Sequence, residues 1–206
     1  MLRMKPQLVV ALAAVTVALA GCAPSGPEPS PSPTETASGS PSPSATPTAE
    51  PVTIVDCEVL LPIEQARMLF GDATEFLGER APTESSGWFP VAEIDSTLAA
   101  ASQAKACAWG VPNSDGVFTI HAVEVTEEQR TTLEAALTAA GFTSVTSGTV
   151  TAYEMTGENE VGTTAATHLF SGTVWVMANA AALSTTGPAA ASALDALRTA
   201  NPTLGL

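Results

Sequence analysis

Beyond residue 50, two spacings of apolar positions divide the chain into expected helices and strands. Apolar residues recur every three or four positions in four segments, which is typical of helices with one buried face. The helices are expected over 62–70, 93–103, 126–140 and 188–199. Pro62 opens the first helix and Gly71 closes it, as these residues commonly do. The third helix begins with a capping-box pattern formed by Thr126 and Gln129.

Segments rich in β-branched and aromatic residues predict strands between these helices. They are the short β-prone run 52–55 and the segments 105–111, 117–125, 142–155 (one or two strands), 165–171 and 173–179. The turn at 112–116 makes a hairpin of the strands around it, and Gly172 joins the last two strands tightly. The stretches 72–90 and 157–162 are polar or glycine-rich and are expected to be irregular. Because hairpins dominate, we predict an α+β fold in which helices pack on an antiparallel sheet.

The first 21 residues predict a secretory signal peptide. Arg3 and Lys5 precede an apolar run of about 13 residues, from Leu8 to Ala20. A membrane-spanning helix needs roughly 20 such residues, whereas a short apolar run after a basic start is typical of an export signal. The expected location of the protein is therefore the extracytoplasmic side of the cell membrane.

The residues Leu19-Ala20-Gly21-Cys22 resemble the bacterial lipobox. That resemblance implies cleavage before Cys22 and attachment of lipid to its sulfur, which would anchor the protein on the membrane. An ordinary secretory signal that happens to end in cysteine is the alternative.

Residues 22–52 predict a disordered linker, and residues 53–206 predict a single folded domain. Nine of the sixteen prolines fall in the linker, among Ser, Thr, Gly and Ala. Such a segment has too little apolar surface to offset the entropy of ordering. Without Arg3 and Lys5, the mature chain carries five basic against 21 acidic side chains. This charge excludes nucleic acid as a partner and disfavours contact with anionic lipid headgroups; a monomer is expected.

The three cysteines have separate expected roles. With lipid on Cys22, Cys57 and Cys107 remain as a pair. In an exported protein they are expected to form a disulfide, and two buried free thiols are the alternative. Neither histidine stands at zinc-ligand spacing from a cysteine, so no metal site is predicted on them.

No motif for catalysis or for a cofactor is found in the sequence, and no catalytic residue or cofactor is predicted. His121 and His168 lie in two expected strands and are able to approach each other across a sheet. Strand histidines are more often core or half-exposed residues, but these two are retained as candidates for ligand contact. Glu154, Glu158 and Glu160 are a candidate cation site, against which a solvated hairpin tip is favoured.

Two adjacent aromatic residues, Trp88 and Phe89, are the other candidates for ligand contact. They end the irregular stretch, and aromatic residues in loops often contact sugars, lipids or partner proteins. Packing at an edge of the core is the alternative. Trp109 and Trp175 fall in expected strands and are predicted to be core residues, the former close to the cysteine pair.

The run Asp56–Pro62, the helix ending at Phe70-Gly71 and the segment Ala106-Cys107-Ala108-Trp109 together form a layout that resembles a known class. It is similar to small actinobacterial envelope lipoproteins, such as the LpqN-like and DUF3558-like groups, and to the extracellular sensor domains of some mycobacterial receptor kinases. The resemblance, over roughly 56–200, implies a Mog1/PsbP-like sandwich, a Cys57–Cys107 bridge and a non-catalytic role in binding or sensing.

The sequence therefore predicts a lipid-anchored module that binds an envelope ligand or a partner protein. A surface hydrolase that uses His121 or His168 is the alternative function. A spacer without a ligand is a third hypothesis.

Overall fold

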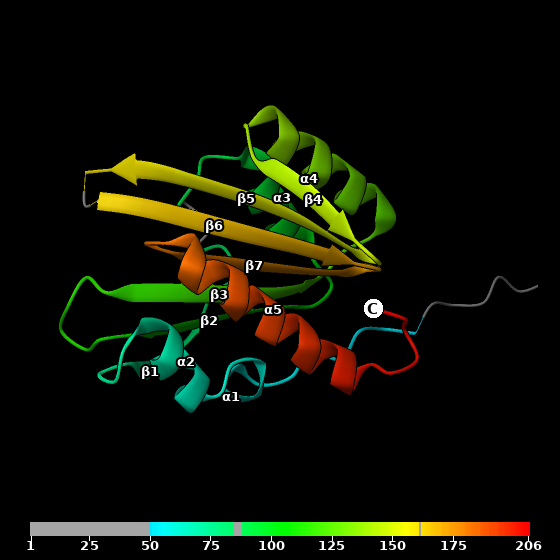
Figure 1. Cartoon of the computed structure of the whole chain (residues 1–206). Helices are drawn as coiled ribbons and strands as arrows, with labels where there is room; N and C mark the ends of the chain where they lie inside the picture. Colours follow the sequence, from blue (N-terminus) through cyan, green and yellow to red (C-terminus); the bar gives the residue numbers. More distant parts are fainter. Residues whose placement is uncertain (1–49, 85–87, 161) are drawn as a thin grey trace, which may run out of the picture. The chain divides into compact units, whose positions relative to one another are not determined.

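The computed structural model describes residues 50–84, 88–160 and 162–206, which form a seven-stranded sheet with helices on both faces (Figure 1). The strand order is β1-β2-β3-β7-β6-β5-β4, and every neighbouring pair is antiparallel. The strands are β1 (Glu75–Arg80), β2 (Ala104–Gly110), β3 (Val117–Glu124), β4 (Thr143–Ser147), β5 (Val150–Asn159), β6 (Gly162–Ser171) and β7 (Val174–Ala180). The predicted α+β class, with helices packed on an antiparallel sheet, is confirmed.

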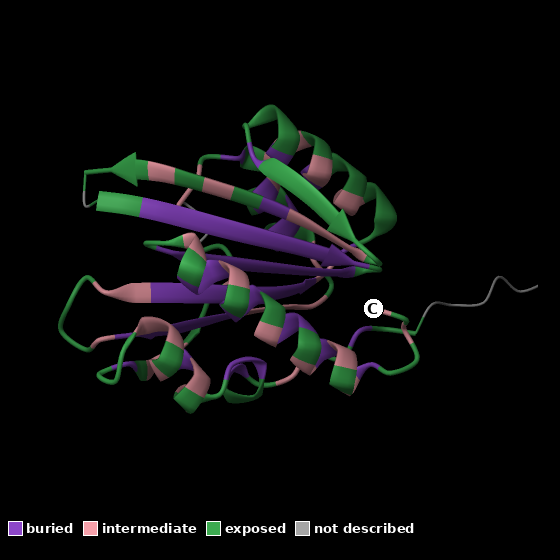
Figure 2. Cartoon of the chain, in the orientation of Figure 1, coloured by how far each residue is buried: buried purple, intermediate pink, exposed green. Residues whose placement is uncertain are grey.

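Two groups of helices cover the two faces of the sheet. The helices are α1 (Cys57–Leu60), α2 (Ile63–Phe70), α3 (Ala92–Ala100), α4 (Glu127–Ala139) and α5 (Leu183–Ala200). Helices α1, α2 and α5 pack on what we call the first face, where α5 buries Leu194 and Leu197. Helices α3 and α4 pack on the second face, where they bury Leu98 and Leu133. The central strands between these layers are almost wholly buried (Figure 2).

Local sequence signals set several element boundaries. The Thr126 hydroxyl accepts a hydrogen bond from the Gln129 backbone, and the Gln129 side chain accepts one from the Thr126 backbone. This confirms the capping box that begins α4. Gly172 has a φ of 54°, which suits glycine in the tight turn between β6 and β7.

Three boundary predictions were wrong. Residues 72–90 were expected to be irregular, but they contain β1, whose charged residues suit an edge strand that is held by pairing with β2. The loop expected at 157–162 is shorter, because β5 continues to Asn159 in register with β6. Helix α5 begins five residues before Pro188, which lies inside the helix and, having no N–H, leaves out one backbone hydrogen bond there.

The chain enters the domain beside its own C-terminal segment. Residues 52–55, expected to be β-prone, form no strand, and Val52 at the predicted end of the linker is buried in the core of the first face. The side chain of Asn201 accepts a hydrogen bond from the Thr53 N–H at 2.7 Å and donates one to the Thr53 carbonyl at 2.9 Å. It also donates to the carbonyl of Leu197 at the end of α5. We call this arrangement the Asn201 clamp.

The predicted signal peptide, Cys22 and most of the predicted linker lie outside the described residues. Within the described ranges, no helix has both the length and the apolar character needed to cross a bilayer.

A disulfide joins Cys57 of α1 to Cys107 of β2, as expected from the pair of cysteines. Both residues are buried in the core of the first face. Trp109 lies two residues further along β2 in the same core and is fully buried, as predicted. The bond therefore fixes a short helix to an inner strand of the sheet.

We expect the disulfide to contribute about 4 kcal/mol to the free energy of unfolding, because it closes a loop of 50 residues in the unfolded chain. Urea unfolding of the wild type with and without reductant measures this difference. The double variant Cys57→Ala/Cys107→Ala is the control, and its free energy of unfolding should be the same with and without reductant. Identical curves for the oxidised and reduced wild type would contradict the prediction.

Candidate functional site

One end of the sheet contains a gap because the central strand β7 stops before its neighbours. Ala180, the last residue of β7, pairs with Ala165 of β6, and β6 extends three residues beyond this level to Gly162. On the other side, Thr119 of β3 pairs with Asn179, and β3 extends to Val117. After Ala180 the chain bends away and enters α5. We call the resulting gap between β3 and β6 the notch.

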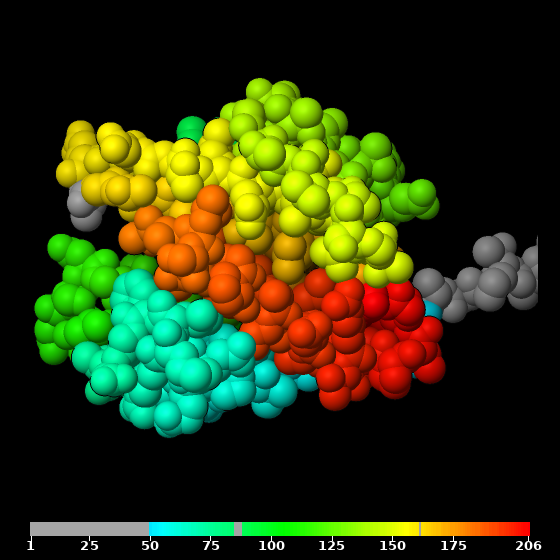
Figure 3. All heavy atoms as spheres, in the orientation of Figure 1, coloured from blue at the N-terminus to red at the C-terminus, as the bar shows by residue number. Residues whose placement is uncertain are grey.

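The notch opens into a pocket with a volume of about 1000 Å³. Figure 3 shows the hollow between the tips of the β5–β6 and β2–β3 hairpins. The pocket is lined by Phe70, Glu84, Trp88, Ser114, Asp115, Gly116, Val117, Asn159, Gly162, Thr163, Thr164 and Ala181. These residues come from α2, the segment before α3, the β2–β3 turn, the β5–β6 hairpin and the end of β7.

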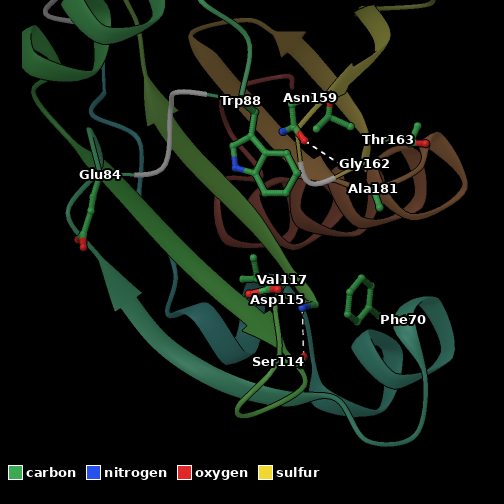
Figure 4. A pocket seen from close by; sticks show the side chains of 12 residues that line it. Phe70, Glu84, Trp88, Ser114, Asp115, Val117, Asn159, Gly162, Thr163 and Ala181 are labelled. Carbon is green, nitrogen blue, oxygen red and sulfur yellow. Dashed lines mark hydrogen bonds between the residues drawn. The ribbon is translucent and has the colours of Figure 1, made fainter.

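Two aromatic side chains border the pocket from opposite faces of the sheet (Figure 4). Phe70, at the end of α2, packs with the core of the first face and lies 5.2 Å from the ring of Phe118. Trp88 lies over the second face, where it also lines a smaller hollow with Ala108 and Thr119. A molecule in the notch would therefore have an aromatic ring on each side.

Trp88 and Phe89 have different environments although they are adjacent. Phe89 packs into the core of the second face, with its ring 5.6 Å from that of Phe142 in an edge-on arrangement. It also lies against Gly157, where an added Cβ would come within 3.1 Å of the Phe89 ring. Phe89 thus anchors the segment to the core, and this contact holds Trp88 at the pocket. The structure places Trp88 at the candidate site and Phe89 beneath it.

The pocket carries negative charge. Its two ionisable lining side chains are the carboxylates of Glu84 and Asp115, and no Lys or Arg occurs among the described lining residues. Arg80 lines the smaller adjoining hollow of about 230 Å³, which shares Glu84, Trp88 and Val117 with the pocket. The other polar groups are neutral hydroxyls and the Asn159 amide, whose oxygen accepts from the Gly162 N–H. The lining is therefore suited to neutral or positively charged molecules.

The two histidines lie in the core and not in the pocket. His121 of β3 and His168 of β6 both pair with Met177 of β7, so the three side chains form a row across the second face. His121 is 0% exposed and His168 is 1% exposed. The predicted approach across the sheet is present, with Met177 between the two rings.

Burial keeps both imidazoles neutral. Burial lowers the pKa of His121 from 6.5 to about 4, and the nearby backbone of Pro82 offsets this only in part. Neither ring nitrogen of His121 forms a hydrogen bond with a described residue. Burial, followed by repulsion from His121, lowers the pKa of His168 to about 3. Protonation of either ring would place an unpaired charge in the core.

A hydrogen bond orients His168. Its Nδ1 accepts from the Trp175 indole N–H at 3.2 Å, and the two rings stack with an interplanar angle of 7°. Because Nδ1 accepts, the neutral ring carries its proton on Nε2. Trp175 is fully buried, as predicted for a core residue. The arrangement explains His168 as a partner of Trp175 inside the core.

The three glutamates considered for a cation are spread along the β5–β6 hairpin. Glu154 lies on the side of α5, 3.7 Å from the position of a Cβ on Gly187, whereas Glu158 pairs with Thr163 near the hairpin tip. Glu160 lies in the turn. Among the described residues, no group of three or more His, Cys, Asp or Glu is placed to hold a metal ion.

The sequence identified Trp88 but not the rest of the pocket lining. Phe70 was assigned to the buried face of its helix, and Ser114 and Asp115 were assigned to a turn. No sequence motif marks Asn159 or Thr163. Only the register of the strands brings these residues together, because it determines where β7 ends relative to β3 and β6.

Comparisons with protein-family models, with curated proteins and with solved structures found no match to this chain.

We expect the buried His121 to make the protein less stable in acid. The unfolded chain binds a proton at His121 with a pKa near 6.5, whereas the folded protein resists it until about pH 4. The free energy of unfolding is therefore unaffected by this group above pH 6.5 and falls as the pH drops towards 4. Between pH 7 and pH 4.5, the wild type should lose about 2–3 kcal/mol more than His121→Leu. Urea unfolding at the two pH values tests this, and equal losses would contradict it.

Proposed function

We propose that this protein is a lipid-anchored module on the extracytoplasmic side of the cell membrane, where it binds an envelope ligand or a partner protein without catalysis. The observation that carries the binding function is the pocket at the notch, with Trp88 and Phe70 on its two sides. Its volume of about 1000 Å³ is at the upper end of the range of ligand sites in proteins. The lipobox-like run ending at Cys22 and the Cys57–Cys107 disulfide support the proposed location.

The character of Trp88 supports binding more than a structural role. Its side chain is only partly buried although tryptophan is the largest apolar side chain, and it is not among the residues that pack against the core of the second face, as its half-buried neighbour Phe89 is. Partly exposed tryptophans at pockets are frequent energetic centres of protein interfaces. The carboxylates of Glu84 and Asp115 favour a neutral or basic ligand over an anionic one.

No observation in the described part of the chain favours the hydrolase hypothesis. A general base must reach the proton that it removes, but the rings of His121 and His168 are buried in the core of the second face. Neither residue lines the pocket. The binding function is therefore the one that the geometry supports.

The anchor is tested by Cys22→Ser. Because a serine hydroxyl cannot form the thioether that carries the lipid, the variant should accumulate as an uncleaved precursor or be released to the medium. Fractionation, with metabolic labelling by a fatty acid analogue, measures both effects. A variant that is processed, membrane-bound and labelled as the wild type is would contradict the lipoprotein proposal.

The pocket is tested by Trp88→Ala, which removes one wall while leaving Phe89 in the core. After crosslinking in intact envelopes, the wild type should recover a specific set of partners or ligands, and the variant should recover at least tenfold less of them. Met68→Ala is the matched control, because Met68 is 81% exposed on α2 and lies outside the pocket lining. Equal recovery by Trp88→Ala and Met68→Ala would contradict binding at this pocket.

A further inference from the structure

The notch has the width of one β-strand. β3 and β6 are both neighbours of β7, so where β7 is present they stand two strand spacings apart, or about 9.6 Å. Beyond Ala180 both flanks continue, to Val117 on one side and to Gly162 on the other. By the register of β3 and β7, Val117 is level with Ala181, so the open space begins beyond Ala181 and is flanked there by Gly162 and Thr163 of β6.

Backbone groups of both flanking strands point towards the line of β7. The Val111 N–H donates to the Gly116 carbonyl, which shows that even-numbered residues of β3 bond towards β2. In an antiparallel ladder the bonding direction alternates along a strand, so Val117 directs its N–H and C=O towards β7. The Val125 N–H, which donates to the Thr173 carbonyl, follows the same alternation.

The same alternation holds on the β6 side. Since the odd-numbered residues of β7 bond to β3, its even-numbered residues bond to their partners on β6, which are Ser171, Leu169, Thr167 and Ala165. The next β6 residue to face the notch is Thr163. No backbone hydrogen bond in the described part of the chain joins Ala181 or Ala182 to either flank. Thr163 thus offers one donor and one acceptor to a strand placed beyond Ala181, whereas the N–H and C=O of Val117 face Ala181 itself.

The walls of the pocket match the two faces of such a strand. Successive side chains of a strand point to opposite faces, and the pocket has Trp88 over the second face and Phe70 on the first. One side chain of an inserted segment would contact the indole and the next would contact the phenyl ring. The carboxylates of Glu84 and Asp115 would favour basic residues beside these two.

We propose that the ligand of the pocket is an extended, neutral or basic polypeptide segment that fills the notch as an added strand, in line with β7. The inference rests on the proposed binding function and specifies the class of ligand. Backbone pairing with Thr163 would supply affinity that depends little on sequence, and Trp88 and Phe70 would select the side chains. A saccharide, which has no strand backbone to pair with these groups, is the competing class of ligand.

The probe is a library of acetylated and amidated hexapeptides, randomised at all six positions and screened against the full chain. Selected peptides should be enriched in Lys or Arg and in β-branched or aromatic residues. N-methylation of the selected peptide at the residues that pair with the flanks should weaken binding at least tenfold, because it removes the backbone donors. Hydrogen exchange at the Thr163 amide should slow when the unmodified peptide binds.

Two variants of one residue separate the backbone from the side chain. Thr163→Pro removes the N–H that faces the notch and leaves the pairing of β6 with β5 intact, so the affinity for the selected peptide should fall at least tenfold. Thr163→Ala keeps the N–H and removes only side-chain atoms, so it should lose less affinity than Thr163→Pro does. Thermal unfolding of both variants confirms that the fold is retained.

The double substitution Glu84→Gln/Asp115→Asn, which removes both negative charges, should weaken the binding of basic peptides most at low salt.

The strand proposal is overturned if Thr163→Pro binds as the wild type does, or if no hexapeptide binds above the level of Trp88→Ala. Neutral oligosaccharides are screened in parallel by quenching of tryptophan fluorescence. Binding of a saccharide that needs Trp88 and is unaffected by Thr163→Pro would also overturn it, while leaving the pocket as the binding site. Failure of the envelope capture described above would instead count against the binding function itself.

Discussion

The need to cover β7 on both faces governs this structure. Every residue of β7 is buried, and its side chains alternate between the two hydrophobic cores. Helices α3 and α4 cover one face, and the chain must leave the sheet after Ala180 for α5 to cover the other. The flanking strands β3 and β6 do not have to leave the sheet at this level, and both continue beyond Ala180. The pocket is therefore a by-product of how the core of the first face is closed.

Much of the fold could be predicted because its signals are local. The capping box of α4, the periodic apolar positions of α2 and the turns at 112–116 and Gly172 depend on neighbouring residues alone. β1 was missed because it has few β-branched residues and is held in place by β2. The early start of α5 was missed because Pro188 was taken to open the helix, whereas it lies within it.

The candidate site could be predicted only in part, for a related reason. A loop tryptophan beside a phenylalanine is visible in the sequence, but which of these two half-buried residues packs against the core depends on Gly157, which makes room for Phe89 from another strand. The histidines were retained as candidates because a strand pattern does not show whether both faces of the sheet are covered. In this fold both faces are covered, and the hydrogen bond from Trp175 explains His168 without a ligand.

The Asn201 clamp has a mechanical consequence. Tension on the chain ahead of Val52 would load the hydrogen bond from the Val52 N–H to Glu124, then the two hydrogen bonds between Thr53 and Asn201, and then the covalent bond between Cys57 and Cys107. The load would pass into the end of β3, the end of α5 and β2, all close to the point of entry. Val52 is hydrogen-bonded to Glu124, at the end of β3 opposite to Val117, so the hairpin tips around the notch lie about 24 Å away along the strand and off this path. A pulling force at the end of the domain where the chain enters would therefore leave the hairpin tips around the notch undistorted.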